Sequence, residues 1–161
     1  LGNRDGAVTP ELKTIAEVWE GAGFKVRVFD DIAQLVWEKL ICNSTYSGPC
    51  TVLEWTIGKV IGDASSWKVA SGCAVEAYEV ARALSITLSF DDPVQYVKDF
   101  GEQMPDAVPS MLLDYRAGRK SEIEVINGSI PRMAAKVDMT VPYNEAIPAL
   151  VLAKESRFSS G

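Results

Sequence analysis

Apolar residues recur three and four positions apart over most of the chain after Asp31, and this spacing predicts helices. Asp31 is a residue type that caps helix starts, and Gly48-Pro49 combines two residues that end helices. We therefore expect the first long helix to begin at Asp31 and to stop at Gly48-Pro49. Its apolar stripe consists of Ile32, Leu35, Val36 and Leu40.

The same spacing predicts further helices. Residues 65–84 form the longest of them, with small side chains that allow close packing, and Asp91-Asp92-Pro93 begins another. A last helix is expected over residues 144–156, and two glycines bracket a short connector at residues 58–62. The chain after Asp31 therefore reads as mainly α.

A different pattern precedes Asp31. Thr9-Pro10 begins a short helix, Gly21-Ala22-Gly23 ends it, and the apolar run at residues 24–29 predicts a strand. In a dinucleotide-binding turn the strand comes first and the glycines lead into the helix, which is the reverse order. We therefore expect a short α/β piece at residues 1–30 and a helical domain at residues 31–161, with no nucleotide-binding loop.

Three polar residues form a second stripe on the first long helix. Lys39, Asn43 and Ser47 are each four positions apart, so their side chains lie one above the other on one face. An ammonium group beside an amide and a hydroxyl could bind and protonate a small carbonyl substrate. Most lysines on amphipathic helices are simply solvated, so the stripe alone is a weak signal.

Composition and net charge argue against several classes of protein. The 161 residues include 47% hydrophobic residues, enough for one sizeable core, and the net charge is −6 without a basic run. These values argue against binding to nucleic acid or to anionic membranes. No apolar stretch approaches the roughly 20 residues that span a bilayer, and the first residues do not resemble a signal peptide. A cytoplasmic protein is the expectation.

The cysteines and the missing histidines exclude several kinds of site. Cys42, Cys50 and Cys73 are odd in number and lack C-x-x-C spacing, and the chain has no histidine. Most zinc sites and all histidine-based triads are therefore excluded, and no metal is expected. We interpret the cysteines as reduced and buried, and Cys42 is the one next to a candidate site residue.

Four blocks of residues follow one another in a fixed order. They are Trp37, Lys39, Leu40 and Asn43; Ser110, Met111 and Asp114; Gly118, Arg119, Glu122, Ile123, Ile126, Asn127 and Gly128; and Val141, Pro142 and Asn144. Together these blocks resemble the ketopantoate reductase (2-dehydropantoate 2-reductase) family, and the resemblance covers nearly the whole chain.

The resemblance implies a fold and a division into domains. Residues 31–161 would be the family's all-helical substrate and dimerisation domain, of the 6-phosphogluconate-dehydrogenase-like type. Residues 1–30 would be the C-terminal edge of an NADP-binding Rossmann domain that is otherwise missing. The chain would then be a C-terminal fragment, inactive alone and forming a homodimer.

The resemblance also implies roles for individual residues. Ketopantoate would be reduced to pantoate with NADPH, a step of pantothenate biosynthesis. Lys39 would donate the proton, and Glu122 would orient Lys39 and contact the cofactor ribose. Asn43, Ser47 and Ser110 would bind the substrate. Because Trp37 and Leu40 would partly bury the lysine beside a carboxylate, Lys39 and Glu122 are expected to titrate as a coupled pair.

Plainer interpretations of these residues stay open. Ser121 and Glu124 have the spacing of a capping box that opens another helix, and Glu122 would suit the positive end of that helix. Ser110 alone could be a helix cap or turn residue. On this view the chain would be a non-catalytic helical dimerisation module.

Two departures from the family pattern concern the substrate. The family commonly has asparagine where this chain has Ser47 and Ile57. Serine has a shorter reach than asparagine, and isoleucine cannot form a hydrogen bond. A paralogue that reduces another keto acid is therefore the second alternative.

Overall fold

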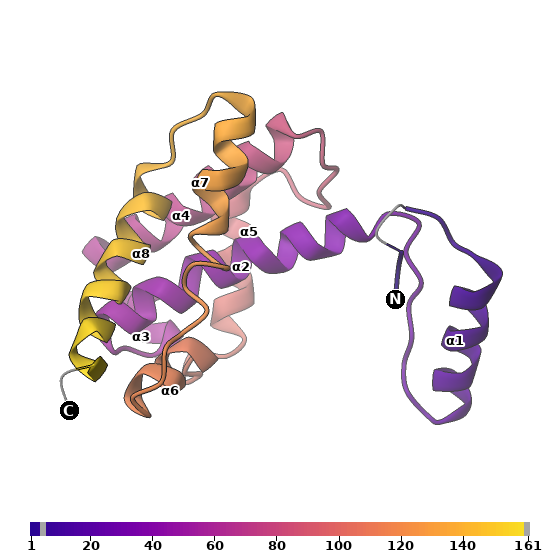
Figure 1. Cartoon of the computed structure of the whole chain (residues 1–161), viewed down its shortest axis with the longest axis horizontal. Coiled ribbons are helices and arrows are strands. Elements are labelled where there is room, and N and C mark those ends of the chain that lie inside the picture. The colour runs from indigo at the N-terminus through magenta and orange to yellow at the C-terminus, as the bar shows by residue number, and fades with distance from the viewer. Residues whose placement is uncertain (4–5, 160–161) are drawn as a thin grey trace.

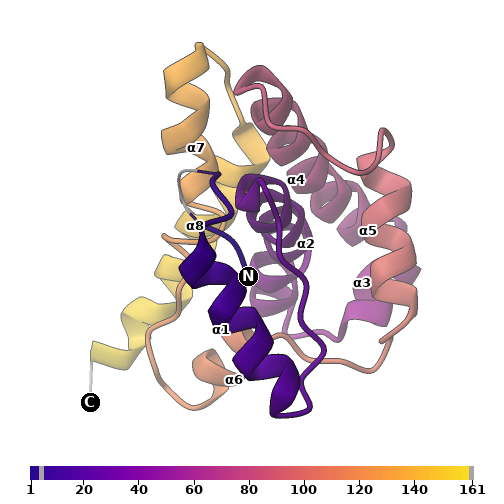
Figure 2. The same cartoon turned by 90° about the vertical axis from the view of Figure 1, so that its right-hand side faces the viewer.

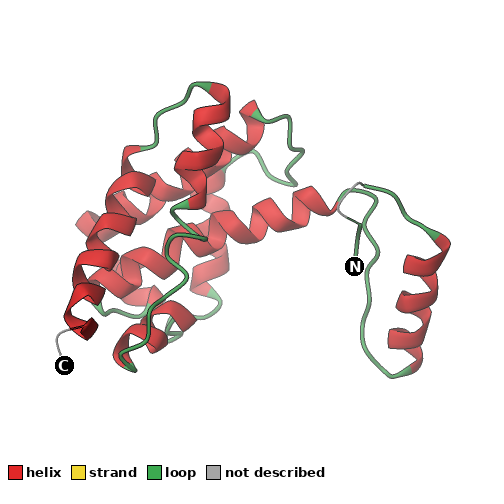
Figure 3. Ribbon diagram, viewed as in Figure 1, coloured by secondary structure: helices red, strands yellow, loops and turns green. Residues whose placement is uncertain are grey.

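The chain folds into a body of helices with a separate N-terminal segment (Figure 1). The computed structural model describes residues 1–3 and 6–159. Within these residues there are helices and loops but no strands (Figure 3). The elements are α1 Pro10–Gly21, α2 Ile32–Leu53, α3 Ile57–Gly62, α4 Ala64–Ala83, α5 Pro93–Glu102, α6 Ser110–Arg116, α7 Ser129–Ala134, α8 Pro142–Glu155, and the 3₁₀ helices η1 Ala135–Val137 and η2 Ser156–Ser159.

Helix α2 is the central element of the body. Figure 2 shows α7 and α8 on one side of α2 and α3 and α5 on the other. Its closest neighbour is α4, which presents Ala70, Ala74 and Ala77 as fully buried side chains. Small residues let two helix axes approach closely, so the alanines bring α4 against Ile41 and the rest of the α2 core face. The predicted helix at residues 65–84 is confirmed.

Helix α2 begins where the sequence predicts and ends later. The Asp31 carboxylate accepts a hydrogen bond from the Ala33 N–H at 2.8 Å, as a helix cap does. The predicted stop at Gly48-Pro49 is wrong, because the helix continues to Leu53. Pro49 is buried there, and the absence of a side chain on Gly48 lets Asn127 and Ile147 pack directly on the backbone. Tertiary packing therefore outweighs the hydrogen bond that proline removes.

The N-terminal segment agrees with the sequence in its helix and differs in its strand. Thr9 caps α1, whose last residue is Gly21, and Gly23 has a left-handed φ of 89°. Residues 24–29 form no strand. Beside them lies the backbone of Leu1, which donates a hydrogen bond to the Arg27 carbonyl and accepts one from the Phe29 N–H. A strand needs a neighbour along its length, and one residue does not provide that.

The segment between α6 and α7 also departs from the prediction. Residues 123–128 are turns, and the next helix begins only at Ser129, so Ser121 and Glu124 form no capping box. The Ser121 N–H instead donates to the Glu155 carboxylate at 2.9 Å, and this contact holds the segment against α8. The expected connector at residues 58–62 is also helical and belongs to α3.

The remaining helix predictions hold. Asp92 caps α5 through the N–H groups of Val94 and Gln95, and α8 spans residues 142–155 where a last helix is predicted at residues 144–156. None of the helices in the described residues combines the length and the hydropathy that crossing a bilayer requires.

Candidate functional site

A cavity of about 200 Å³ lies between α2, α5 and the loop that leads into α6. Its polar side chains are Asn43, Ser47 and Ser110, which come from two distant parts of the sequence. The remaining lining residues are Cys42, Tyr46, Ile57, Phe100, Met104, Ala107, Val108 and Pro109. The structure therefore brings together all three residues predicted to bind substrate.

The hydroxyl of Ser47 differs from its neighbours on α2. Ser44, Thr45 and Thr51 each donate their side-chain hydroxyl to a backbone carbonyl of the same helix. The Ser47 hydroxyl makes no such bond in the described structure, although Ser47 is only 6% exposed. A hydroxyl held at a cavity wall without an internal partner is able to bind a ligand.

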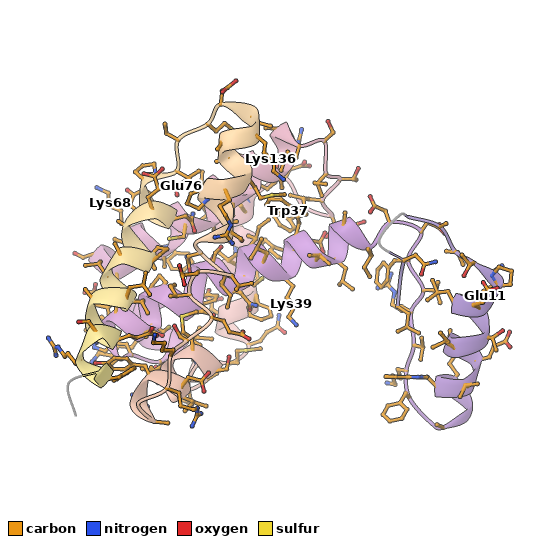
Figure 4. The ribbon with its side chains drawn as sticks, in the orientation of Figure 1. Glu11, Trp37, Lys39, Lys68, Glu76 and Lys136 are labelled. Atoms are coloured by element: carbon orange, nitrogen blue, oxygen red, sulfur yellow. The ribbon has the colours of Figure 1, made fainter. Side chains whose placement is uncertain are left out.

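Lys39 lies one turn before Asn43 on the same face of α2. Its side chain projects from the opposite side of α2 from Trp37 (Figure 4). Trp37 is buried in the core, whereas Lys39 is exposed, so the predicted partial burial of the lysine is wrong. Residues at i and i+2 point to opposite sides of a helix, which explains why burying Trp37 leaves Lys39 open.

Glu122 is also exposed and lies on the segment between α6 and α7. No ion pair joins Lys39 and Glu122 within 4.0 Å in the described part of the chain. The coupled pair expected from the sequence is therefore not formed, and neither residue lines the cavity. The preceding carboxylate on α2, Glu38, is engaged elsewhere, because it accepts hydrogen bonds from Gln34 and from the Ser89 N–H.

A buried hydrogen-bond network lies behind the cavity. Asn127 donates to the Ser44 carbonyl at 2.8 Å and to the Asn144 side chain at 3.0 Å, and both asparagines are fully buried. Asn144 in turn donates to the Cys73 carbonyl and to Glu76. Glu76 also accepts the N–H groups of Tyr143 and Asn144 and so caps the start of α8.

This network gives two of the motif asparagines a structural role. Asn127 fixes the segment that carries Glu122 to α2, at the residue next to Asn43. Glu76 was not predicted from the sequence, because a single glutamate on an amphipathic helix is usually a solvated residue. The only related signal in the sequence was Asn144, and spacing alone could not identify Glu76 as the residue that it contacts.

The cysteines are free and buried, as predicted. Cys42 lines the cavity, and burial together with the nearby Glu38 raises the pKa of its thiol to about 11. Burial likewise raises the pKa of Cys50 to about 12. At neutral pH both are protonated thiols, so they contribute apolar volume and no nucleophile.

In the described residues, no group of three or more cysteine, aspartate or glutamate side chains is arranged to hold a metal ion.

Comparison with known proteins identifies the family. Residues 31–155 match the family described as ketopantoate reductase PanE/ApbA C terminal. The 2-dehydropantoate 2-reductase of Archaeoglobus fulgidus is 27% identical over 156 residues, which are 97% of this chain and 52% of the relative. The chain thus spans about half the length of the curated relatives it matches.

Solved structures agree with this match. A PanE/ApbA family ketopantoate reductase from Ralstonia eutropha JMP134 superposes with a TM-score of 0.86 at 28% identity, covering 94% of this chain and 50% of that one. A D-mandelate dehydrogenase in complex with NADH gives a TM-score of 0.83 at 26% identity, with 92% and 52% covered. By sequence and by structure, the chain belongs to the ketopantoate reductase family, and residues 31–155 correspond to its C-terminal domain.

Proposed function

We propose that this chain is the substrate-binding part of a reductase that converts a 2-keto acid to the 2-hydroxy acid, with ketopantoate as the first candidate substrate. The observation that carries the proposal is the grouping on α2. Lys39, Asn43 and Ser47 share one face of the helix, and the latter two line a cavity that also receives Ser110. Residues 1–30 would complete a Rossmann domain, and residues 31–161 would form the helical domain.

Each side chain has a step in the reaction that suits it. Asn43 and Ser110 would donate hydrogen bonds to the substrate carboxylate, and Ser47 would contact the substrate beside them. Lys39 lies about 6 Å further along the helix axis, where it would face the keto oxygen. The ammonium would stabilise the negative charge that builds on this oxygen and then transfer a proton from its Nζ.

A nicotinamide cofactor, NADPH in our proposal, would supply the hydride when bound. Glu122 fits such a cofactor, because its carboxylate is exposed, makes no ion pair with another described residue and can accept hydrogen bonds from ribose hydroxyls. The relative solved with NADH supports a nicotinamide in general. Glu122 would also approach Lys39 once the site is closed around its ligands, which would restore the expected pair.

Self-association is part of the proposal. A second cavity of about 390 Å³ with an almost wholly apolar lining lies between the end of α2, the start of α4 and α8. Leu53 and Leu150 line it and are partly exposed, so burial of this face would favour a homodimer. The free, buried cysteines fit a reducing compartment such as the cytoplasm.

The test is reductase activity with ketopantoate and NADPH, followed by loss of nicotinamide absorbance. We expect turnover from the complete protein that joins this chain to a nucleotide-binding domain, and none from this chain alone. Turnover by the isolated chain would contradict the assignment of cofactor binding to a separate domain. If the complete protein reduced no 2-keto acid, a helical dimerisation module would be the better interpretation.

A further inference from the structure

We propose that this site prefers, over ketopantoate, a 2-keto acid whose side chain is a pure hydrocarbon, without the hydroxyl group that ketopantoate carries at C4. This inference rests on the proposed function and specifies its substrate. It follows from which residues lining the cavity have hydrogen-bonding groups to offer a ligand.

Three of the residues that line the cavity have a side-chain amide or hydroxyl group available for a ligand. Asn43 and Ser47 stand one turn apart on α2, and Ser110 is the first residue of α6. A 2-keto acid presents a carboxylate and a keto oxygen. Together with Lys39, these three side chains can satisfy both groups, and none is then left for another polar group on the substrate.

Most of the other lining residues have apolar side chains, and together they form what we call the apolar wall. They are Ile57, Phe100, Met104, Ala107, Val108 and Pro109. Ile57 is only 5% exposed, so its side chain is a fixed part of the wall. Tyr46 also lines the cavity, but its hydroxyl donates to the Val97 carbonyl, and its ring is stacked on Phe100. The tyrosine therefore presents ring surface to a ligand.

Several backbone groups of this wall are also engaged. The Ile57 N–H donates to the Ala107 carbonyl at 3.1 Å, and the Ala107 N–H donates to the Met104 carbonyl at 3.0 Å. The Pro109 carbonyl accepts from the Leu112 and Leu113 N–H groups. A substrate hydroxyl placed against these residues would give up its water without gaining a partner, whereas methyl or aryl groups would bury apolar surface.

One part of the wall is held in place by close backbone packing. The Gly58 N–H donates to the Pro105 carbonyl at 2.8 Å, and a Cβ on Gly58 would lie 2.8 Å from the Pro105 Cβ. The start of α3, which carries Ile57, is thus packed directly on the loop that carries Ala107 and Val108. This contact therefore fixes the position of Ile57 in the wall.

A matched pair of substrates tests the inference. Ketopantoate and 3,3-dimethyl-2-oxobutanoate differ only in the C4 hydroxyl. In the complete reductase we expect kcat/KM to favour the compound without the hydroxyl by about tenfold to a hundredfold, the range that an unpaired hydroxyl costs in an apolar pocket. Phenylglyoxylate should also be reduced.

A substitution in the wall should move this preference. Ile57→Asn supplies a hydrogen-bond partner, so we expect it to reduce the ratio of the two kcat/KM values by about tenfold. The control is Leu152→Asn, which makes the same kind of change at an exposed position of α8 outside this cavity and should leave the ratio unchanged. If Ile57→Asn does not fold, Met104→Gln makes the equivalent change at a more exposed lining position.

The outcomes separate the two proposals. Equal or faster reduction of ketopantoate by the unmodified protein would overturn the inference and leave the proposed function standing. A preference for the hydrocarbon substrate that Ile57→Asn and Met104→Gln both leave unchanged would also overturn it. If no 2-keto acid were reduced, the proposed function itself would fail and the inference with it.

Discussion

Two groups of polar side chains meet at the middle of α2, and they differ in where their hydrogen bonds go. Asn127 and Asn144 are fully buried and donate to groups within the protein, including the Ser44 carbonyl. Asn43 and Ser47, one residue and three residues from Ser44, face a cavity instead. Asn43, Asn127 and Asn144 match the family pattern, and Ser47 stands where the family commonly has asparagine. The sequence pattern alone therefore does not distinguish the buried group from the group at the cavity.

The difference teaches which residues maintain the structure and which are available for chemistry. The buried group ties α2, α4, α8 and the segment of Glu122 together, and it is costly to disturb because unpaired polar groups are expensive inside a protein. The group at the cavity, Asn43 and Ser47, contributes little to stability, because these side chains gain no hydrogen bonds to described parts of the protein when the chain folds. We predict that substitutions in the group at the cavity change activity with little effect on stability, and that substitutions in the buried group do the opposite.

The largest effect should come from Lys39. Lys39→Met removes the ammonium that stabilises and protonates the keto oxygen, so kcat of the complete reductase should fall by about 10²–10⁴-fold. The midpoint of thermal unfolding should hardly move, because the side chain is exposed. Lys136→Met, on the opposite side of α2 in Figure 4, is the matched control and should keep full activity. Equal activity of the two variants would remove Lys39 from the mechanism.

The next effect should come from the buried group. Asn144→Ala removes one acceptor of the Asn127 amide and one donor each to the Cys73 carbonyl and the Glu76 carboxylate. We expect the free energy of unfolding to fall by about 2–4 kcal/mol, measured by urea denaturation. Asn43→Ala, the same change in the group at the cavity, should cost less than about 0.5 kcal/mol. Similar losses in both variants would break the distinction between the groups.

A smaller effect should come from the close contact of Gly48. A Cβ at this position would lie 2.8 Å from the Asn127 Oδ1 and even closer to Ile147. Gly48→Ala should therefore destabilise the fold by about 1–3 kcal/mol, despite the better helix propensity of alanine. Gly21→Ala, where an added Cβ meets nothing within 4 Å, is the control and should be neutral or slightly stabilising. A stabilised Gly48→Ala variant would show that the network can move aside.

The last effect is gradual and is spread over alkaline pH. The pKa of Cys42 is raised to about 11 in the folded state by burial and by Glu38, and an unfolded thiol titrates near 8.5. Between these values the unfolded chain loses a proton that the folded chain keeps. Stability is therefore complete below about pH 8.5 and falls as pH rises towards 11, by at most about 1.4 kcal/mol per pH unit for this thiol.

Thermal unfolding of Cys42→Ala across this pH range measures the effect. Its stability should fall less steeply with pH than that of the unmodified chain, while Cys50 continues to contribute. An identical slope in both proteins would mean that Cys42 is more accessible to solvent than the structure indicates.

Local signals in the sequence predicted most of the helices. Thr9, Asp31 and Asp92 cap α1, α2 and α5, because a capping side chain acts on N–H groups two or three residues away. Pro49 and the Ser121–Glu124 spacing gave wrong boundaries. In both places the deciding contacts come from distant residues, Asn127 and Ile147 beside Gly48 and Glu155 at Ser121.

The candidate site was predictable in part. Helical spacing alone aligned Lys39, Asn43 and Ser47, whereas Ser110 needed the resemblance to the family, since nothing local indicates that it faces α2. Glu76 could not be predicted, because its partners at residues 143 and 144 are brought to it only by the packing of α8 on α4. Exposure of Lys39 was missed because burial of Trp37 was assumed to extend to its neighbour.

The most direct test is a crystal structure of the complete protein with oxamate, an unreactive analogue of a 2-keto acid. We predict that the Lys39 Nζ lies within about 2.7–3.2 Å of the analogue's amide oxygen, and that Asn43 and Ser110 bind its carboxylate. Oxamate bound away from α2, or Lys39 still directed into solvent with the analogue in the cavity, would contradict the account.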